Sequence, residues 1–177
     1  MSTHVATDAS KRVQSLHAQP WTLTARTSGA LRKYLDAQEH VTPHFSWAEF
    51  ACHDPENTPV PESLRPNTIR LCWLLEQMRH ELGDVSMRIG SGYRTQEWNK
   101  HVGGAADSRH THADAADFMA DDVDAWIANG AAADRAAVVD IANRIFSTGG
   151  VGNETSGTLH VDARGWKARF VNWVAAT

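Results

Sequence analysis

Three side chains that bind metal ions well lie in two short segments that are far apart along the chain. The first segment, 108–117, carries His110 and Asp117, and the second, 159–162, carries His160. Two histidines and one carboxylate are a donor set typical of catalytic zinc, which takes three protein ligands and leaves a fourth position for water. Zinc bound in this way lowers the pKa of that water and polarises a scissile carbonyl. The pattern predicts a hydrolytic site with Zn²⁺ as cofactor.

The residues around these ligands predict strands. Residues 117–120 are a short apolar run, and apolar and polar residues alternate over 159–163. Side chains two apart on a strand point to the same face, so His160 and Asp162 should project together. We therefore expect His160 to hold the metal while Asp162 takes the proton of the metal-bound water as general base.

Further motifs occur in a fixed order around this donor set. They are a Ser-Gly-Tyr-Arg segment within 89–95, a Ser-x-His segment at 108–110, a Gly-rich segment at 149–152 and a His-Val-Asp segment at 160–162. Together with an entry segment at 44–52, they resemble the M15 family of zinc peptidases. These are D-alanyl-D-alanine carboxypeptidase-like enzymes that cut peptidoglycan peptides. The resemblance covers residues 44–173.

The resemblance implies roles for individual residues. His110, Asp117 and His160 match the zinc ligands, Arg94 matches the arginine that binds and polarises the substrate, and Ser108 matches a polar residue beside the site. A guanidinium suits this task because it offers two donors to a carbonyl or carboxylate. Trp166 follows the His160 segment and is a candidate for a wall of the substrate groove, with ordinary packing as the alternative.

Two positions depart from the family pattern. Some relatives place the catalytic acid three residues before the last histidine, where this chain has Gly157. Asp162 is then the first choice for the base, and Glu154 is the alternative. Ala113 stands where the family usually has glycine, a change that is tolerated if the backbone there is not at positive φ.

The pattern of elements indicates an α+β domain with a small antiparallel sheet. Apolar spacing predicts helices over 66–82, 95–101 and 134–146, a strand over 85–89, and a last strand or helix over 170–174. Ser46 and Glu49 have capping-box spacing and predict a helical turn over 46–50. By resemblance, the fold is Hedgehog- or DD-peptidase-like, with helices flanking a sheet around the zinc site.

The chain divides into two parts by the same criteria. Residues 1–43 lie outside the resemblance and contain a short amphipathic helix over 27–38, whereas 44–177 form the zinc peptidase domain. The two cysteines, Cys52 and Cys72, do not form a zinc-finger pair, and we expect both to be reduced.

Composition excludes some classes of partner. A net charge of −4 gives no reason to expect nucleic acid as a partner. No run of eighteen apolar residues is present, so no membrane insertion is expected. The first ten residues lack the apolar core of a secretory signal. We expect a monomer made in the cytoplasm that reaches the cell wall by holin-type or secretion-system release.

These observations predict zinc-dependent hydrolysis of peptide bonds in the stem or cross-link peptides of peptidoglycan. An endopeptidase or carboxypeptidase of the phage endolysin type is the expected class. One alternative is a non-catalytic, zinc-stabilised wall-binding module, which the missing acid at Gly157 allows. The other is a cytoplasmic hydrolase of D-dipeptides, which the absence of a signal would explain.

Overall fold

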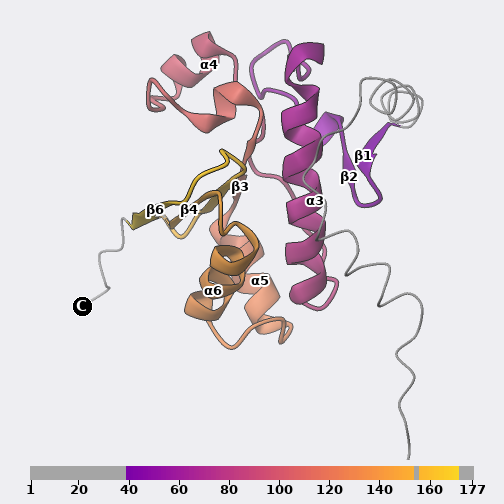
Figure 1. Ribbon diagram of the computed structural model, residues 1–177, viewed down its shortest axis with the longest axis vertical. Helices are drawn as coiled ribbons and strands as arrows, with labels where there is room; N and C mark the ends of the chain where they lie inside the picture. Colours follow the sequence, from indigo (N-terminus) through magenta and orange to yellow (C-terminus); the bar gives the residue numbers. More distant parts are fainter. Residues whose placement is uncertain (1–38, 154–155, 172–177) are drawn as a thin grey trace, which may run out of the picture. The chain divides into compact units, whose positions relative to one another are not determined.

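The structure, a computed structural model, describes residues 39–153 and 156–171. Its elements are β1 His40–Thr42, β2 Phe45–Ser46, η1 Ala48–Phe50, η2 Glu62–Leu64, α3 Arg65–Glu81, α4 Gln96–His101, η3 Arg109–His112, β3 Ala115–Phe118, α5 Ala120–Ala128, α6 Arg135–Ile145, β4 Gly150–Asn153, β5 Leu159–Asp162 and β6 Ala168–Val171. This confirms the α+β class. Helix α3 stands beside the sheet, and α5 and α6 lie together at one end of it (Figure 1).

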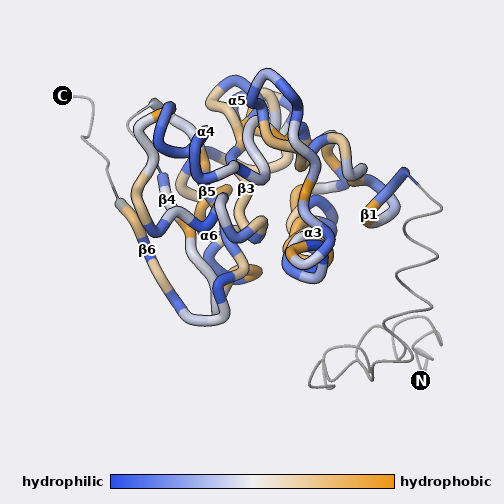
Figure 2. The backbone as a smooth tube through the Cα atoms, turned by 90° about the horizontal axis from the view of Figure 1, so that it is seen from above, coloured by the Kyte–Doolittle hydropathy of each residue, from blue (hydrophilic) through white to orange (hydrophobic). Residues whose placement is uncertain are grey.

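Helix α3 forms where the apolar spacing predicted a helix. Its first turn contains Pro66, which suits a position whose amide has no partner inside the helix. Leu71, Leu75 and Met78 are fully buried. Hydrophobic and hydrophilic residues both recur from turn to turn of this helix, as expected for an amphipathic helix (Figure 2). The buried side packs against β1 and α6 and forms a large part of the core.

The four-stranded sheet has the order β3-β5-β4-β6. Strands β3 and β4 both pair antiparallel with β5, and β6 joins the far edge parallel to β4. Asp117 of β3 lies opposite His160 of β5. Directly opposed residues share a face of the sheet, so this register brings the two side chains together.

The two faces of this sheet differ in composition. One face, called here the core face, carries the buried polar residue Asn153 and otherwise buried apolar residues on three strands: Ala116, Phe118, Val151, Leu159 and Val161. The other, called here the site face, carries Asp117, His160 and Asp162, with Gly150 and Gly152 beside them on β4. The strand period of two therefore places all three titratable side chains, Asp117, His160 and Asp162, on the face opposite the apolar packing residues.

Several predicted elements are present with shifted ends. Helices α4 and α6 match the predictions for 95–101 and 134–146, and both begin after a side-chain cap, from Thr95 and Asp134 respectively. The predicted strand over 85–89 is not formed, since these residues belong to no helix or strand, and an isolated bridge to β3 occurs at Ser91 instead. The helical turn predicted over 46–50 is present as η1, and Glu49 Oε2 accepts from the amide and the hydroxyl of Ser46, as in a capping box. Ser46 itself lies in β2, and Trp47 is the residue from which η1 begins.

Some parts of the chain were not foreseen or are not described. Helix α5 was missed, and β4 forms in the Gly-rich segment at 149–152, for which no strand was predicted. The predicted helix over 27–38 lies outside the described residues, and the division into 1–43 and 44–177 stays a prediction. Cys52 and Cys72 are both free and buried, as expected. No described helix is long and apolar enough to cross a membrane.

Candidate metal centre

The three predicted ligands meet on the site face. His110 comes from η3, Asp117 from β3 and His160 from β5, and one potential donor atom from each lies within 4.8 Å of the others. Asp117 is central, because its Oδ1 lies 3.2 Å from His110 Nε2 and 2.8 Å from His160 Nδ1. The structure thus brings His160 next to Asp117, although the two residues are 43 positions apart in the sequence.

The turn after η3 sets the position of His110 relative to Asp117. Ala113 ends η3 in the left-handed region, at φ 56° and ψ 30°. Its carbonyl accepts a hydrogen bond from Thr68 Oγ1 of α3, which fixes the turn to the core. Since an L-residue in this region costs about 1–2 kcal/mol, the condition under which alanine replaces glycine freely is not met. Ala113 is a strained position beside the site.

A backbone carbonyl orients the ring of His110. His110 Nδ1 donates to the carbonyl of Gly92 over 2.6 Å, so Nε2 is the nitrogen turned toward Asp117. Gly92 itself passes so close to Phe50 that an added Cβ would lie 2.7 Å from the Phe50 Cα. The Ser-Gly-Tyr-Arg segment therefore holds the first ligand through its backbone, and its glycine permits that approach.

The ring of His160 lies between two carboxylates. Its Nδ1 faces Asp117, and its Nε2 lies 3.2 Å from Asp162 Oδ2. Burial by itself would lower the pKa of His160, but the hydrogen bonds to Asp117 and Asp162 outweigh it and raise the pKa to about 9. Burial would likewise raise the pKa of Asp117, but His110 and His160 hold it well below its usual range.

Arg94 reaches the same cluster. Its Nη2 donates to Asp117 Oδ2 over 2.9 Å and its Nε donates to Ser91 Oγ over 3.0 Å. Oδ1 of Asp117 thus faces both histidines, whereas Oδ2 faces the guanidinium and also lies 3.2 Å from His110 Nε2. Nη1 of Arg94 has no hydrogen-bond partner within 39–153 and 156–171.

The other predicted site residues lie at different places. Ser108 is half-buried just before η3, and its carbonyl accepts from Thr111. Trp166 is 59% exposed, and the guanidinium carbons of Arg109 and Arg164 lie 5.6 and 5.9 Å from its ring centre. Glu154 lies outside the described residues.

Sequence reasoning missed two neighbours of the cluster. Arg164 pairs with Asp162 through both Nε and Nη2. Phe170 of β6 is 43% exposed, and its ring centre lies 6.3 Å from that of His160. A signal for Arg164 was available, since it follows Asp162 at the spacing of two that places strand residues on one face.

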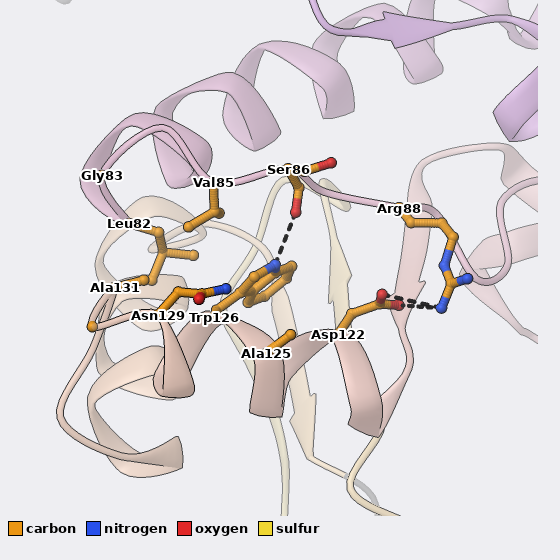
Figure 3. A pocket seen from close by; sticks show the side chains of 11 residues that line it. Leu82, Gly83, Val85, Ser86, Arg88, Asp122, Ala125, Trp126, Asn129 and Ala131 are labelled. Carbon is orange, nitrogen blue, oxygen red and sulfur yellow. Dashed lines mark hydrogen bonds and ion pairs between the residues drawn. The ribbon is translucent and has the colours of Figure 1, made fainter.

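A cavity of about 610 Å³ lies elsewhere in the molecule. It runs between 82–88 and α5, where the indole nitrogen of Trp126 donates to the carbonyl of Ser86 and Arg88 pairs with Asp122 (Figure 3). None of the predicted site residues within the described part of the chain lines it. The metal-binding cluster and this cavity are therefore separate features.

The residues of the cluster fit a zinc ion. Two imidazole nitrogens and a carboxylate are donors that zinc takes, and three of them leave a position open. Each histidine has a second hydrogen-bond partner behind it, Gly92 for His110 and Asp162 for His160. Ligating histidines almost always have such partners, which fix the ring and its tautomer.

Similarity to known proteins also supports a zinc site. Residues 43–161, more than half of the chain, match the pattern of the peptidase M15 family. Over 56 residues the chain is 41% identical to the zinc D-Ala-D-Ala carboxypeptidase of Streptomyces albus G. That match covers 32% of this chain and 22% of the relative's length.

Proposed function

The chain belongs to the peptidase M15 family of zinc metallopeptidases, and from this premise we propose that it hydrolyses peptide bonds in the stem or cross-link peptides of peptidoglycan. The observation that supports this most is the convergence of His110, Asp117 and His160, with ligand atoms within 4.8 Å of one another. These three residues would hold Zn²⁺. When bound, the zinc supplies Lewis-acid polarisation of the scissile carbonyl and an acidified water.

Arg94 has two tasks in this proposal. Its Nη2 donates to Asp117 Oδ2 and so helps to fix that carboxylate, whose Oδ1 lies between the two histidines. Its Nη1 is the donor offered to the carbonyl oxygen of the substrate, where negative charge develops during attack. Oriented donors at such a position lower the barrier by several kcal/mol in hydrolases.

Ser108 and Trp166 are proposed to contact the peptide on either side of the reacting bond. The exposed indole of Trp166 offers a flat surface, and the arginines beside it are paired with carboxylates, Arg109 with Asp114 and Arg164 with Asp162. A groove wall of this kind suits an uncharged stretch of peptide better than a free anion, because its charges are already neutralised.

The reaction also needs a group that takes a proton from the attacking water and gives one to the leaving amine. Asp162 and Glu154 are the two carboxylates proposed for this role. Gly157, at the position that carries the acid in some relatives, has no side chain, and its carbonyl accepts from Arg135 Nη1.

We also propose that the chain acts in lysis of the cell wall. A phage endolysin-type enzyme would act as a monomer and lyse the wall after release from the cytoplasm. Residues 1–43 would form a separate segment ahead of the peptidase domain. The absence of an acid at Gly157 favours one alternative, a wall-binding module that keeps zinc without cutting.

Digestion of purified peptidoglycan tests the proposal. The protein, loaded with one zinc per chain, is incubated with sacculi with and without a chelator, and the new termini are identified by mass spectrometry. New amino and carboxyl termini at a D-amino acid, lost with chelator and restored by zinc, are expected. Binding to sacculi without new termini would identify the non-catalytic module, and cleavage of free D-dipeptides alone would identify the dipeptide hydrolase.

A further inference from the structure

Asp162 contacts the side of His160 that faces away from the other ligands. We propose that Asp162 is a positioning residue, which fixes the His160 ring so that Nδ1 faces the metal, and that it is not the general base. The inference rests on the proposed zinc site and refines the roles within it.

The carboxylate of Asp162 is fully buried and accepts from several donors. Its Oδ1 accepts from the amides of Gly150 and Arg164 at 3.0 and 3.1 Å and from Arg164 Nε at 2.8 Å. Its Oδ2 accepts from Arg164 Nη2 at 2.6 Å and lies 3.2 Å from His160 Nε2. A carboxylate has about four lone-pair sites, so these contacts use its acceptor capacity. A general base needs a free oxygen directed at the water, which these contacts do not leave.

Arg164 holds the carboxylate in place and is itself held by two aromatic rings. Its guanidinium carbon lies 4.8 Å from the ring centre of Phe170 and 5.9 Å from that of Trp166. The Nε and Nη2 donors form the two-pronged pair with Asp162 that a guanidinium makes best. The aromatic residues beside the site thus restrict Arg164, Arg164 restricts Asp162, and Asp162 restricts the ring of His160.

Gly150 of β4 provides the space in which Asp162 lies. A Cβ added at Gly150 would lie 2.0 Å from Asp162 Oδ2 and 2.6 Å from its Cγ. Any side chain at this position would push the carboxylate away from the strand. The glycine therefore serves the placement of a neighbouring side chain as well as the local backbone.

The position of the imidazole separates Asp162 from the metal. Asp117 contacts Nδ1 and Asp162 contacts Nε2 of the same ring. Because the two nitrogens lie on opposite sides of the ring, an ion held by Asp117 and Nδ1 has the ring between it and Asp162. An outer carboxylate of this kind orients a ligating histidine and raises its basicity. Of the two carboxylates proposed as base, Glu154 is the one that this inference retains.

The tautomer of His160 tests the inference in the unaltered chain. Long-range ¹H–¹⁵N NMR spectra of the zinc-loaded full-length protein, labelled with ¹⁵N-histidine, distinguish a metal-bound Nδ1 from a metal-bound Nε2. We expect His160 to carry its proton on Nε2 and to bind zinc through Nδ1. Zinc on Nε2 would overturn the inference, because Asp162 would then have no proton to accept from the ring.

Two substitutions disturb the same contact in different ways. Asp162→Asn weakens the acceptor, whereas Gly150→Ala leaves Asp162, Arg164 and His160 intact and displaces the carboxylate. Loss of an outer hydrogen-bond partner typically weakens metal binding by about 10- to 100-fold. We expect both variants to weaken zinc in a competitive titration and to shift the visible spectrum of the cobalt-substituted protein. If Asp162→Asn does not fold, Gly150→Ala still gives the result.

Glu76→Gln is the matched control. Glu76 also contacts a histidine ring, with its Oε2 2.8 Å from His44 Nδ1, and an arginine, Arg79, lies 3.5 Å away. His44 is not part of the metal cluster. Unchanged zinc affinity and an unchanged cobalt spectrum are expected for Glu76→Gln. If this variant weakens zinc as much as Asp162→Asn does, the effect is general destabilisation and the inference fails.

Zinc affinity and turnover separate this inference from the proposed function. Asp162→Asn with wild-type zinc affinity and no turnover would make Asp162 the base and overturn the positioning role. A wild-type protein that cuts no wall peptide would refute the proposed function. The zinc affinities and the His160 tautomer are measured without turnover, so they decide the positioning role in that case as well.

Discussion

The core face and the site face of the sheet are built from the same short strands but depend on different interactions. On the core face, Phe118 is fully buried and its ring meets that of Trp126 edge-on, with centroids 5.2 Å apart. On the site face, the adjacent residue Asp117 contacts His110 and His160. A register shift of one residue would exchange the faces, so the packing of the core face also fixes the site.

Because the two faces depend on different interactions, mutations should affect folding stability and zinc binding separately. Changes on the core face should lower the free energy of unfolding and leave the zinc affinity of the folded protein unchanged. Changes on the site face should weaken zinc binding, and without zinc they should cost less stability than core-face changes because the polar residues contribute little apolar burial.

Phe118→Ala should have the largest effect. Removing a buried phenylalanine typically costs about 3–5 kcal/mol, because transfer and cavity terms add. Urea denaturation in the presence of chelator measures the loss, and calorimetric titration below the unfolding transition measures zinc affinity. Phe118→Leu, which keeps most of the volume, is the control and should recover most of the stability. Zinc binding weakened as much as by a ligand substitution would show that the two faces are not separable.

His160→Ala should abolish the stabilisation that zinc gives. For one site, zinc at a hundred times its Kd adds about 2.7 kcal/mol to the wild-type free energy of unfolding. The variant should gain nothing, as measured by urea denaturation with and without zinc. His112→Ala is the control, because that exposed histidine is close in sequence to His110 but outside the cluster. Full zinc occupancy in His160→Ala would remove His160 from the ligand set.

The effect of pH should distinguish the two forms of the protein. Without zinc, the pKa of His160 is raised from 6.5 to about 9. A raised pKa gives stability that is fully present below about pH 6.5 and is lost as the pH rises through 9, about 3 kcal/mol in total, of which about 2 kcal/mol is lost between pH 6.5 and pH 8.5. Zinc requires the neutral ring, so the zinc-loaded form does not show this loss. The difference in Tm between the two forms should therefore widen from pH 6.5 to pH 8.5, and a constant difference would contradict the prediction.

Ala113→Gly should have the smallest effect and a stabilising one. Glycine relieves the cost of the left-handed conformation, about 1–2 kcal/mol, but adds freedom to the unfolded chain. The net gain should be about 0.5–1 kcal/mol in urea denaturation, with zinc affinity unchanged. Ala116→Gly in β3 is the control and should destabilise, since Ala116 lies in a regular strand on the core face. A loss of stability in Ala113→Gly would contradict the assigned strain.

Much of this arrangement could be predicted from local sequence. The stripe of α3 and the caps of α4 and α6 depend on neighbours along the chain, and spacing reveals them. The donor set was also predictable, because His110, Asp117 and His160 are good metal ligands and their spacing resembles that of the zinc ligands of the M15 family. Their convergence agrees with the peptidase M15 match over residues 43–161.

The rest depends on contacts between distant segments. Strand β4 contains two glycines, which suggest a turn, and it is a strand because β5 and β6 pair with it on both sides. The carboxylate of Asp162 has no free oxygen because Gly150 and Arg164 both donate to it. Neither residue, read alone in the sequence, would reveal these contacts. The positive φ of Ala113 is likewise set by the connection between η3 and β3.

The most direct test of the account is the position of zinc itself. A crystal of the zinc-loaded protein, measured at the zinc absorption edge, gives an anomalous difference map that locates the ion. We predict one peak on the site face, about 2.0–2.2 Å from His110 Nε2, an oxygen of Asp117 and His160 Nδ1. A peak at exposed histidines such as His80 or His101, with none among these three residues, would contradict the central claim.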